Sequence, residues 1–409
     1  MAQAYDASVS DVGPLGPGDE DDNPFSGMPF FGDLAKMLQN QGAMSWDAAR
    51  QLALTVATGG VSEPNVEPAD RIALEELARV AQLQVEHATG FNTAACRVTA
   101  VTRSAFARSA LDTYRPLFDD LAASLQAPEA PTGDPDPMGS DASDPTAFLG
   151  PIMKLIGPMM LGMTAGSMVG HLAQRSLGPY SLPVPRPSDQ IGIVLANVDE
   201  FGTAWSLPSD DLRLWVCLHE IAHHAVLGVP HVRSRLERHL HEYLSGFEPD
   251  PSALETKLAG LDLADPSAAT GLEDVFNDPE ALLGAIQSPA QRELLPHLEA
   301  LVAVIVGYVD HLLDEVGGTL LASYGQVTEA LRRRRVQADP SDRFVERLLG
   351  LELSQATYDR GEAFVNGVVE REGTQGLGRL WKSDRNLPTP NEIDAPGLWL
   401  ARIELPDTD

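Results

Sequence analysis

Apolar residues recur at three- and four-residue intervals along much of the chain, which is the spacing of one face of an α-helix. Before residue 126 this pattern predicts amphipathic helices over 71–89 and 98–125. From Asp210 onward nearly every segment has helical spacing, and proline stands at several of the boundaries. These later helices are expected over 210–228, 231–246, 279–287, 290–315, 325–336, 341–350 and 354–371.

One short segment has a different pattern. Residues 191–197, IGIVLAN, follow a proline-rich turn and contain a run of β-branched and aliphatic side chains. Such a run between turn residues predicts a strand, and this is the clearest one in the chain. The predicted fold class is therefore mainly α with a small β element.

Two acidic stretches have few large apolar side chains and cannot bury enough surface to offset the entropy of ordering. Residues 1–27 are expected to form a disordered tail, and residues 126–146 an acidic linker or insertion. This divides the rest of the chain into an N-terminal helical region, 28–125, and a mainly helical region, 147–409.

A nearly uncharged segment, 148–172, carries Gly162, Gly166 and Gly170 at four-residue spacing. The pattern suits either a membrane helix that dimerises or a buried helix that another helix approaches closely. Lys154 interrupts the apolar run and leaves too short a span, so we expect the buried helix and no transmembrane span. The segment is also rich in methionine, which keeps peripheral membrane contact or a substrate-facing groove as an alternative.

Charge and cysteine content limit the binding partners and the cellular compartment that we expect. Lys and Arg total 29 against 59 Asp and Glu in 409 residues, a formal charge of −30, which argues against binding to nucleic acid or anionic membranes. Cys96 and Cys217 lie in apolar segments and suit reduced, buried thiols. The first residues have neither a basic region nor an apolar region of the secretory type, so a cytoplasmic location is expected.

The strongest chemical signal is His219-Glu220-Ile221-Ala222-His223, inside a segment of helical apolar spacing. On a helix the two histidines lie one turn apart on one face, so both imidazoles can bind one zinc ion. Glu220 lies beside them and can take a proton from a zinc-activated water. The three could instead be ordinary helix residues, but burying them without a metal or other partners would be costly.

Five segments of the chain form a recognisable set: NPFSGMPFFGD at 23–33, WVCLHEIAHHAV at 215–226, GYVDH at 307–311, LLGLEL at 348–353 and LPTPNEIDAPGLW at 387–399. They resemble segments of the actinobacterial zincin-like proteins described as hydrolases or zinc-dependent metalloproteases, some of them linked to coenzyme F420 biosynthesis. The resemblance implies a zincin-type fold, with the motif helix beside a short strand, and peptidase chemistry. It runs through most of the chain.

A catalytic zinc usually has three protein ligands, and the third is not evident. Members of the similar family often carry Glu just before the Gly-Tyr-Val-Asp motif, where this chain has Val306. Asp310, one helical turn further along, is the favoured ligand, because a carboxylate in so apolar a helix needs compensation. Glu242 and His311 are the alternatives.

The sequence thus predicts a hydrolase with a single zinc ion held by His219, His223 and Asp310, and with Glu220 as general base. A metallopeptidase is the first expectation, with a peptide or small amide as substrate. Two rivals stay open: a non-catalytic, zinc-stabilised helical scaffold, and a hydrolase of a small metabolite. The oligomeric state is left open.

Overall fold

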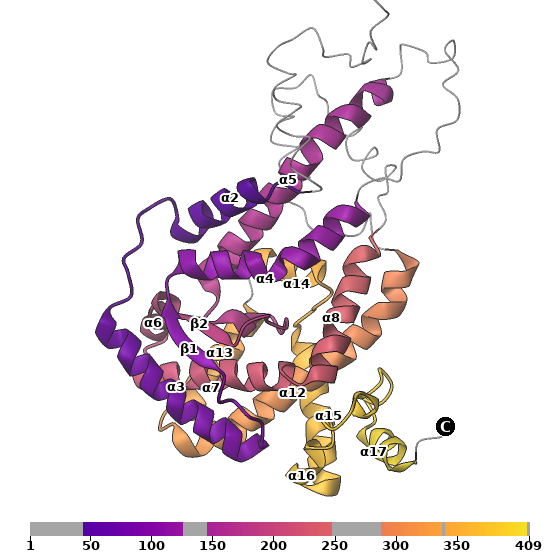
Figure 1. The fold of residues 1–409 in the computed structure, drawn as a ribbon. Coiled ribbons are helices and arrows are strands. Elements are labelled where there is room, and N and C mark those ends of the chain that lie inside the picture. The colour runs from indigo at the N-terminus through magenta and orange to yellow at the C-terminus, as the bar shows by residue number, and fades with distance from the viewer. Residues whose placement is uncertain (1–43, 126–144, 248–287, 338–339, 407–409) are drawn as a thin grey trace, which may run out of the picture. The chain divides into compact units, whose positions relative to one another are not determined.

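Most of the predicted helices are present in the computed structural model, which describes residues 44–125, 145–247, 288–337 and 340–406 (Figure 1). Helices α7, α8, α13, α14 and α15 match the predicted ranges within about two residues, as expected for helix ends. Helix α12 continues further than predicted. The helices are α2 (Trp46–Thr58), α3 (Pro68–Thr89), α4 (Arg103–Ser124), α5 (Pro145–Arg175), α6 (Leu195–Ala204), α7 (Ser209–Leu227), α8 (Pro230–Ser245), α12 (Pro289–Leu320), α13 (Tyr324–Val336), α14 (Pro340–Leu348), α15 (Gln355–Glu372), α16 (Thr374–Leu377) and α17 (Pro396–Glu404), with short 3₁₀ helices η1 (Pro179–Ser181) and η2 (Asp384–Asn386).

Some predictions lie outside the described residues: the acidic tail at 1–27, the helix at 279–287 and positions 126–144 of the linker. The described residues all fall in one unit, Ala43–Asp409. Helices from both sides of 126–144 pack together in it, with α4 against α5 and α8, and α3 against α7. The division into regions 28–125 and 147–409 stays a prediction.

A two-stranded parallel sheet supplies the β element, formed by β1 (Arg97–Val101) and β2 (Gln190–Val194). The register sets Val98 opposite Ile191 and Val101 opposite Val194. The prediction of a strand at 191–197 is confirmed for its first part, but α6 begins at Leu195.

The first four residues of the helix predicted over 98–125 are instead strand β1, and the helix begins at Arg103. The sequence Arg97-Val-Thr-Ala-Val101 alternates between buried and more exposed side chains. This period of two, together with the β-branched residues, was the signal for a strand. The apolar helix that follows it in sequence concealed the change of period.

The glycine stripe of α5 is a helix–helix contact, as expected. A Cβ atom at Gly162 or Gly166 would lie 2.3 Å from the Ser45 carbonyl oxygen and 2.4 Å from that of Ala49, respectively. Backbone atoms cannot move aside as a flexible side chain can, so α2 packs this close only against glycine. Among the described residues, no helix combines the length and the apolar character that crossing a membrane requires.

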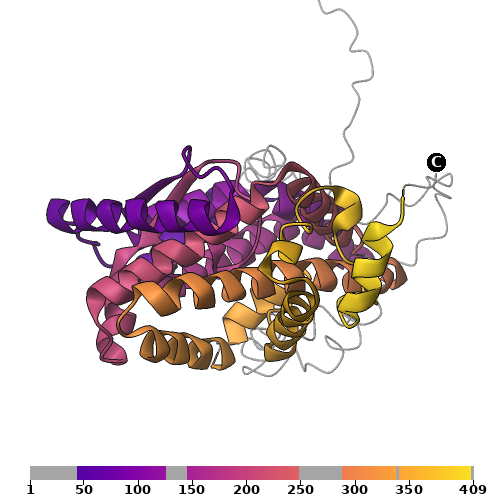
Figure 2. The same ribbon diagram turned by 90° about the horizontal axis from the view of Figure 1, so that it is seen from below.

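Helix α7, which carries the histidine motif, lies in the middle of the packing. It contacts α3 on one side and α12 on the other, and also β2, η1, α6, α8 and α13 (Figure 2). Most of its side chains from Leu212 to Leu227 are buried. Polar groups on such a helix must find partners or ligands inside the protein.

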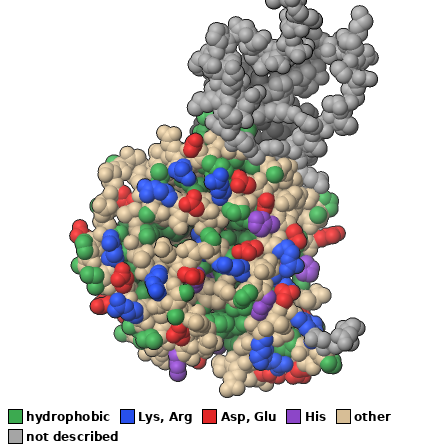
Figure 3. All heavy atoms as spheres, viewed as in Figure 1, with side chains coloured by type: hydrophobic (Ala, Val, Ile, Leu, Met, Phe, Trp, Pro, Cys, Tyr) green, Lys and Arg blue, Asp and Glu red, His purple; other side chains and the backbone are tan. Residues whose placement is uncertain are grey.

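On the surface, basic and acidic side chains are interspersed over the face seen in Figure 3.

Candidate metal centre

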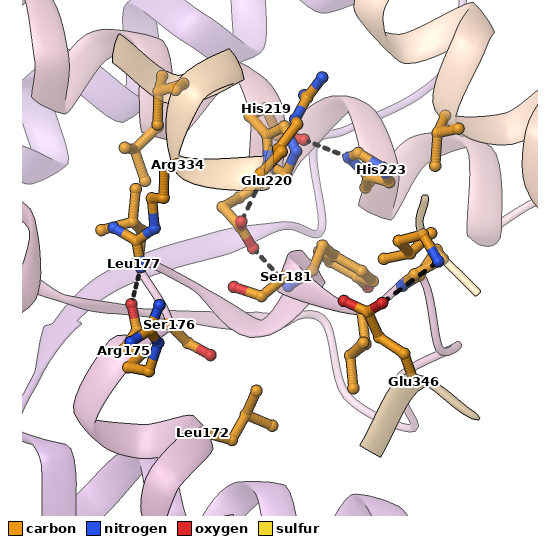
Figure 4. A pocket seen from close by; sticks show the side chains of 18 of the residues that line it. Leu172, Arg175, Ser176, Leu177, Ser181, His219, Glu220, His223, Arg334 and Glu346 are labelled. Carbon is orange, nitrogen blue, oxygen red and sulfur yellow. Dashed lines mark hydrogen bonds and ion pairs between the residues drawn. The ribbon is translucent and has the colours of Figure 1, made fainter. Parts of the chain in front are cut away.

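The helical spacing of α7 brings His219 and His223 together, with their ring centroids 4.3 Å apart. Glu220 and His223 are almost fully buried, with 1% and 3% of their surface exposed. Trp215, one turn before His219, stacks on its ring at a centroid distance of 5.1 Å. Packing therefore restricts both imidazoles and the carboxylate. Figure 4 shows the side chains of His219, Glu220 and His223 together at the cavity.

Hydrogen bonds define which nitrogen of each ring carries the proton. Nδ1 of His223 lies 3.0 Å from the main-chain oxygen of His219, which can only accept, so this nitrogen donates. Nδ1 of His219 lies 3.0 Å from Oε1 of the Glu220 carboxylate and donates in the same way. Each ring is then left with Nε2 as the nitrogen that can bind a metal ion.

Burial also keeps His223 in the form that binds a metal. The loss of solvent around the ring lowers the pKa of His223 well below its ordinary value, and the neighbouring His219 lowers it further. A neutral imidazole has the lone pair that a metal ion needs. The pair of histidines therefore fits a zinc ion in ligand type and tautomer, and His223 fits it in charge as well.

Tyr180 in η1 contacts two of these residues. Its main-chain N–H donates to Oε2 of Glu220 at 2.8 Å. Its ring stacks on that of His223 with centroids 6.0 Å apart and planes inclined by 12°. The Glu220 carboxylate thus accepts hydrogen bonds at both oxygens, one from α7 and one from η1.

His224 does not join the other two histidines. Its Nε2 lies 3.3 Å from Oδ1 of Asp189, and its Nδ1 is 2.8 Å from the Tyr180 hydroxyl. The carboxylate can only accept, so Nε2 carries the proton and Nδ1 accepts from the tyrosine. Burial lowers the pKa of His224, in keeping with a neutral ring. His224 connects α7 to the segment before β2 and is not a ligand candidate.

A cavity of about 150 Å³ opens beside the motif, and His219, Glu220 and His223 form part of its wall. The volume exceeds that of a few water molecules and is small for a drug-sized ligand. The rest of the wall comes from the end of α5, the segment 177–183, α12, α13, α14 and α15 (Figure 4). Its other charged residues are Arg175, Arg334, Arg335 and Glu346.

The predicted third ligands lie elsewhere. Both oxygens of Asp310 are bonded to Arg335, at 2.7 and 2.8 Å, and Asp310 does not line the cavity. Glu242 is largely exposed and lies 3.6 Å from His239. His311 lines a separate, smaller hollow together with Asp310. Among the described residues, no three His, Cys, Asp or Glu side chains are grouped closely enough to hold a metal ion.

Two residues of the cavity wall were not predicted as site residues from the sequence. Glu346 on α14 is 9% exposed and lines the cavity with both histidines. A carboxylate between the buried residues Val345 and Leu348 was a signal for it in the sequence. Val306 on α12, where members of the similar family often carry Glu, lines the same cavity as His219, Glu220 and His223.

The chain is similar to a protein family and to a solved structure. A family model described as zincin-like metallopeptidase matches residues 44–400. No curated protein matches the chain. A crystal structure of a protein from Chloroflexus aurantiacus, described as a "putative hydrolase with a novel fold", superposes with a TM-score of 0.61 at 24% identity. The match covers 89% of this chain and 100% of that one, and at this identity it shows the fold alone.

Proposed function

The chain belongs to the zincin-like metallopeptidase family, and we propose that it is a zinc-dependent hydrolase that cleaves peptide bonds. The single observation that carries the proposal is the arrangement of His219 and His223. Both rings are fixed by hydrogen bonds at Nδ1, lie 4.3 Å apart and line a cavity. Two imidazoles with Nε2 available, next to a buried glutamate, are the ligands and base that zinc hydrolases use.

In this proposal His219 and His223 hold the zinc ion through Nε2, and Glu220 moves the proton. The ion, when bound, would lower the pKa of a water molecule and polarise the scissile carbonyl group. Glu220 accepts a proton from the attacking water and donates it to the leaving nitrogen as the C–N bond breaks.

Two carboxylates are candidates for the third ligand. Asp310, predicted from the sequence, would have to exchange its ion pair with Arg335 for the metal. Glu346 also has a partner, since it accepts a hydrogen bond from the N–H of Leu353 at 3.4 Å, but unlike Asp310 it lines the cavity that contains both histidines. We therefore place Glu346 before Asp310.

Four further features are proposed from the sequence and from the family resemblance. They are the cytoplasmic location, the actinobacterial origin, the link to coenzyme F420 biosynthesis and the single zinc ion per chain. The rival substrate is a small metabolite with an amide bond. The rival without catalysis is a zinc-stabilised scaffold, for which exposed Met159 and Met163 on α5, 46% and 43% accessible, offer an apolar contact.

Metal analysis and hydrolysis together test the proposal. Protein purified without chelator should contain about one zinc per chain, and His219→Ala or His223→Ala should lose it. Glu220→Gln should keep the zinc but lose hydrolysis of a quenched-fluorescence peptide library by about 10²- to 10⁴-fold. Wild-type protein that binds no zinc from zinc-containing medium would refute the proposal. Zinc binding without any cleavage would favour the scaffold.

A further inference from the structure

The backbone at Gly178 lies directly against the side chain of Glu220. A Cβ atom at position 178 would be 2.4 Å from Cδ of Glu220 and 2.6 Å from its Oε2. Gly178 has φ −157° and ψ −178°, an extended conformation that any residue can adopt. Glycine is therefore needed here for space, and the space is taken by the Glu220 carboxylate.

The same turn supplies a hydrogen bond to this carboxylate. Two residues after Gly178, the N–H of Tyr180 donates to Oε2 of Glu220 at 2.8 Å. A glutamate side chain has three rotatable bonds and loses substantial entropy when it is held in one position. The turn 178–180 restricts this freedom in two ways, by contact at Gly178 and by the hydrogen bond from Tyr180.

The turn itself is anchored to parts of the fold that lie outside α7. The N–H of Val194 in β2 donates to the carbonyl oxygen of Leu177 at 2.9 Å. The guanidinium of Arg186 donates to the carbonyl oxygen of Pro179 and, at 3.2 Å, to the hydroxyl of Tyr114 on α4. Arg186 is only 6% exposed.

A third anchor is the Tyr180 hydroxyl, which donates to His224 at 2.8 Å. The sheet, α4 and the end of the motif helix thus all determine where the turn lies.

We infer that the turn 178–180 is a positioning element for the general base, with Gly178 and Tyr180 as positioning residues that act through Glu220. The inference rests on the proposed function for the catalytic role of Glu220. A base must be held within about 0.5 Å of its productive position. An anchored backbone meets this requirement better than a mobile side chain, because its N–H and its Cα position are set by the fold.

A stability cycle and a kinetic comparison test the inference with Gly178→Ala. Because the added methyl group meets Glu220, Gly178→Ala should lower the melting temperature of the wild type. The loss should persist in the Glu220→Gln background, where the side chain keeps its size, and should vanish with Glu220→Ala, which removes the contacted atoms. Gly318→Ala and Gly325→Ala are matched controls, since a Cβ atom at either position would meet nothing within 4 Å.

The kinetic arm uses the peptide that wild-type enzyme cleaves fastest in the same library. Gly178→Ala should lower kcat by about 10- to 100-fold with little change in KM, as a displacement of about 1 Å can do. Its zinc content should stay at the wild-type level. Glu220→Asp should itself lower kcat, but in that background Gly178→Ala should lower kcat by a smaller factor, because the shorter side chain withdraws from the methyl group.

Equal loss of stability in the wild-type and Glu220→Ala backgrounds would overturn the inference, as would a Gly178→Ala enzyme with wild-type kcat. An inactive wild-type protein would count against the proposed function instead. The stability cycle would still show whether the turn holds the Glu220 side chain.

Discussion

Asp310 and Arg335 form a bidentate ion pair, with Oδ2 bonded to Nη1 at 2.7 Å and Oδ1 to Nη2 at 2.8 Å. The Arg335 guanidinium also lies over the ring of Tyr358, 4.2 Å from its centroid. Arg335 lines the cavity beside the histidines, whereas Asp310 does not. The negative charge of Asp310, which lies in the apolar helix α12, is therefore compensated by the Arg335 cation from α13. We therefore propose that a residue other than Asp310 is the third zinc ligand.

The first prediction compares the two candidate carboxylates. Glu346→Gln should weaken zinc binding by more than the roughly 10- to 100-fold typical of a residue that only supports a ligand. Asp310→Asn should leave zinc affinity unchanged and lower stability by about 1 kcal/mol, because the pair with Arg335 is partly exposed. Competition with a chromophoric chelator measures both affinities. The reverse result would restore Asp310 as the ligand.

The second prediction concerns Val306, which is 3% exposed and lines the cavity. Val306→Glu places a carboxylate where the similar family often has one. Without metal the variant should melt below the wild type, because a buried carboxylate lacks compensation. With zinc it should gain more stability than the wild type does. Val306→Gln is the control of equal size, and an identical response to zinc in both variants would contradict the prediction.

The third prediction concerns the contact between α2 and α5. A Cβ atom at Gly166 would lie 2.4 Å from the carbonyl oxygen of Ala49 and 2.9 Å from its Cα. Gly166→Ala should therefore destabilise the protein by about 1–3 kcal/mol, although alanine has the higher helix propensity. Urea unfolding measures the change. Gly318→Ala, where nothing lies within 4 Å, should be neutral or stabilising, and equal effects of the two would argue against the close packing.

The fourth prediction is a pH dependence of stability that arises at Glu392. Burial acts to raise its pKa, but hydrogen bonds from Arg402 and from the Thr389 N–H outweigh burial, and the pKa lies below its ordinary value of 4.5. The folded state thus favours the charged form. Its contribution is complete above pH 4.5 and is lost as the pH falls through the lower pKa of the folded state.

Unfolding experiments with Glu392→Gln check this sign. The variant should be less stable than the wild type at neutral pH by about 1.5–3 kcal/mol, the range for hydrogen bonds to a charged group. The difference should shrink as the pH falls below 4.5. A difference that grows on acidification would mean that the ion pair with Arg402 does not stabilise the fold.

The fifth prediction concerns the two thiols, which are both free and buried. Burial raises the pKa of Cys96 to about 12 and also raises that of Cys217. Thiols held in the protonated form react slowly. Native protein should therefore take up a thiol reagent far more slowly than protein in denaturant. Rapid stoichiometric labelling of the native protein would show that one of these sites opens.

Helix positions and the motif followed from the sequence because both depend on local spacing. Apolar residues three and four apart predict a helical face whatever the helix later packs against. Spacing alone likewise brings His219 and His223 together, since both belong to one helix. The glycine stripe of α5 predicted a close helix contact for the same reason.

Only the tertiary structure could identify the contacts of a residue whose interaction partner lies far along the chain. Asp310 faces Arg335, which is 25 residues later, and nothing local could assign that ion pair in preference to a metal. Strand β1 needs β2, almost a hundred residues away, to bond its backbone. Helical spacing showed that Glu220 lies beside two histidines. Only the folded chain shows that the backbone of Gly178 and Tyr180 holds its carboxylate, because packing between distant segments is set by the shape and hydrogen bonds of both.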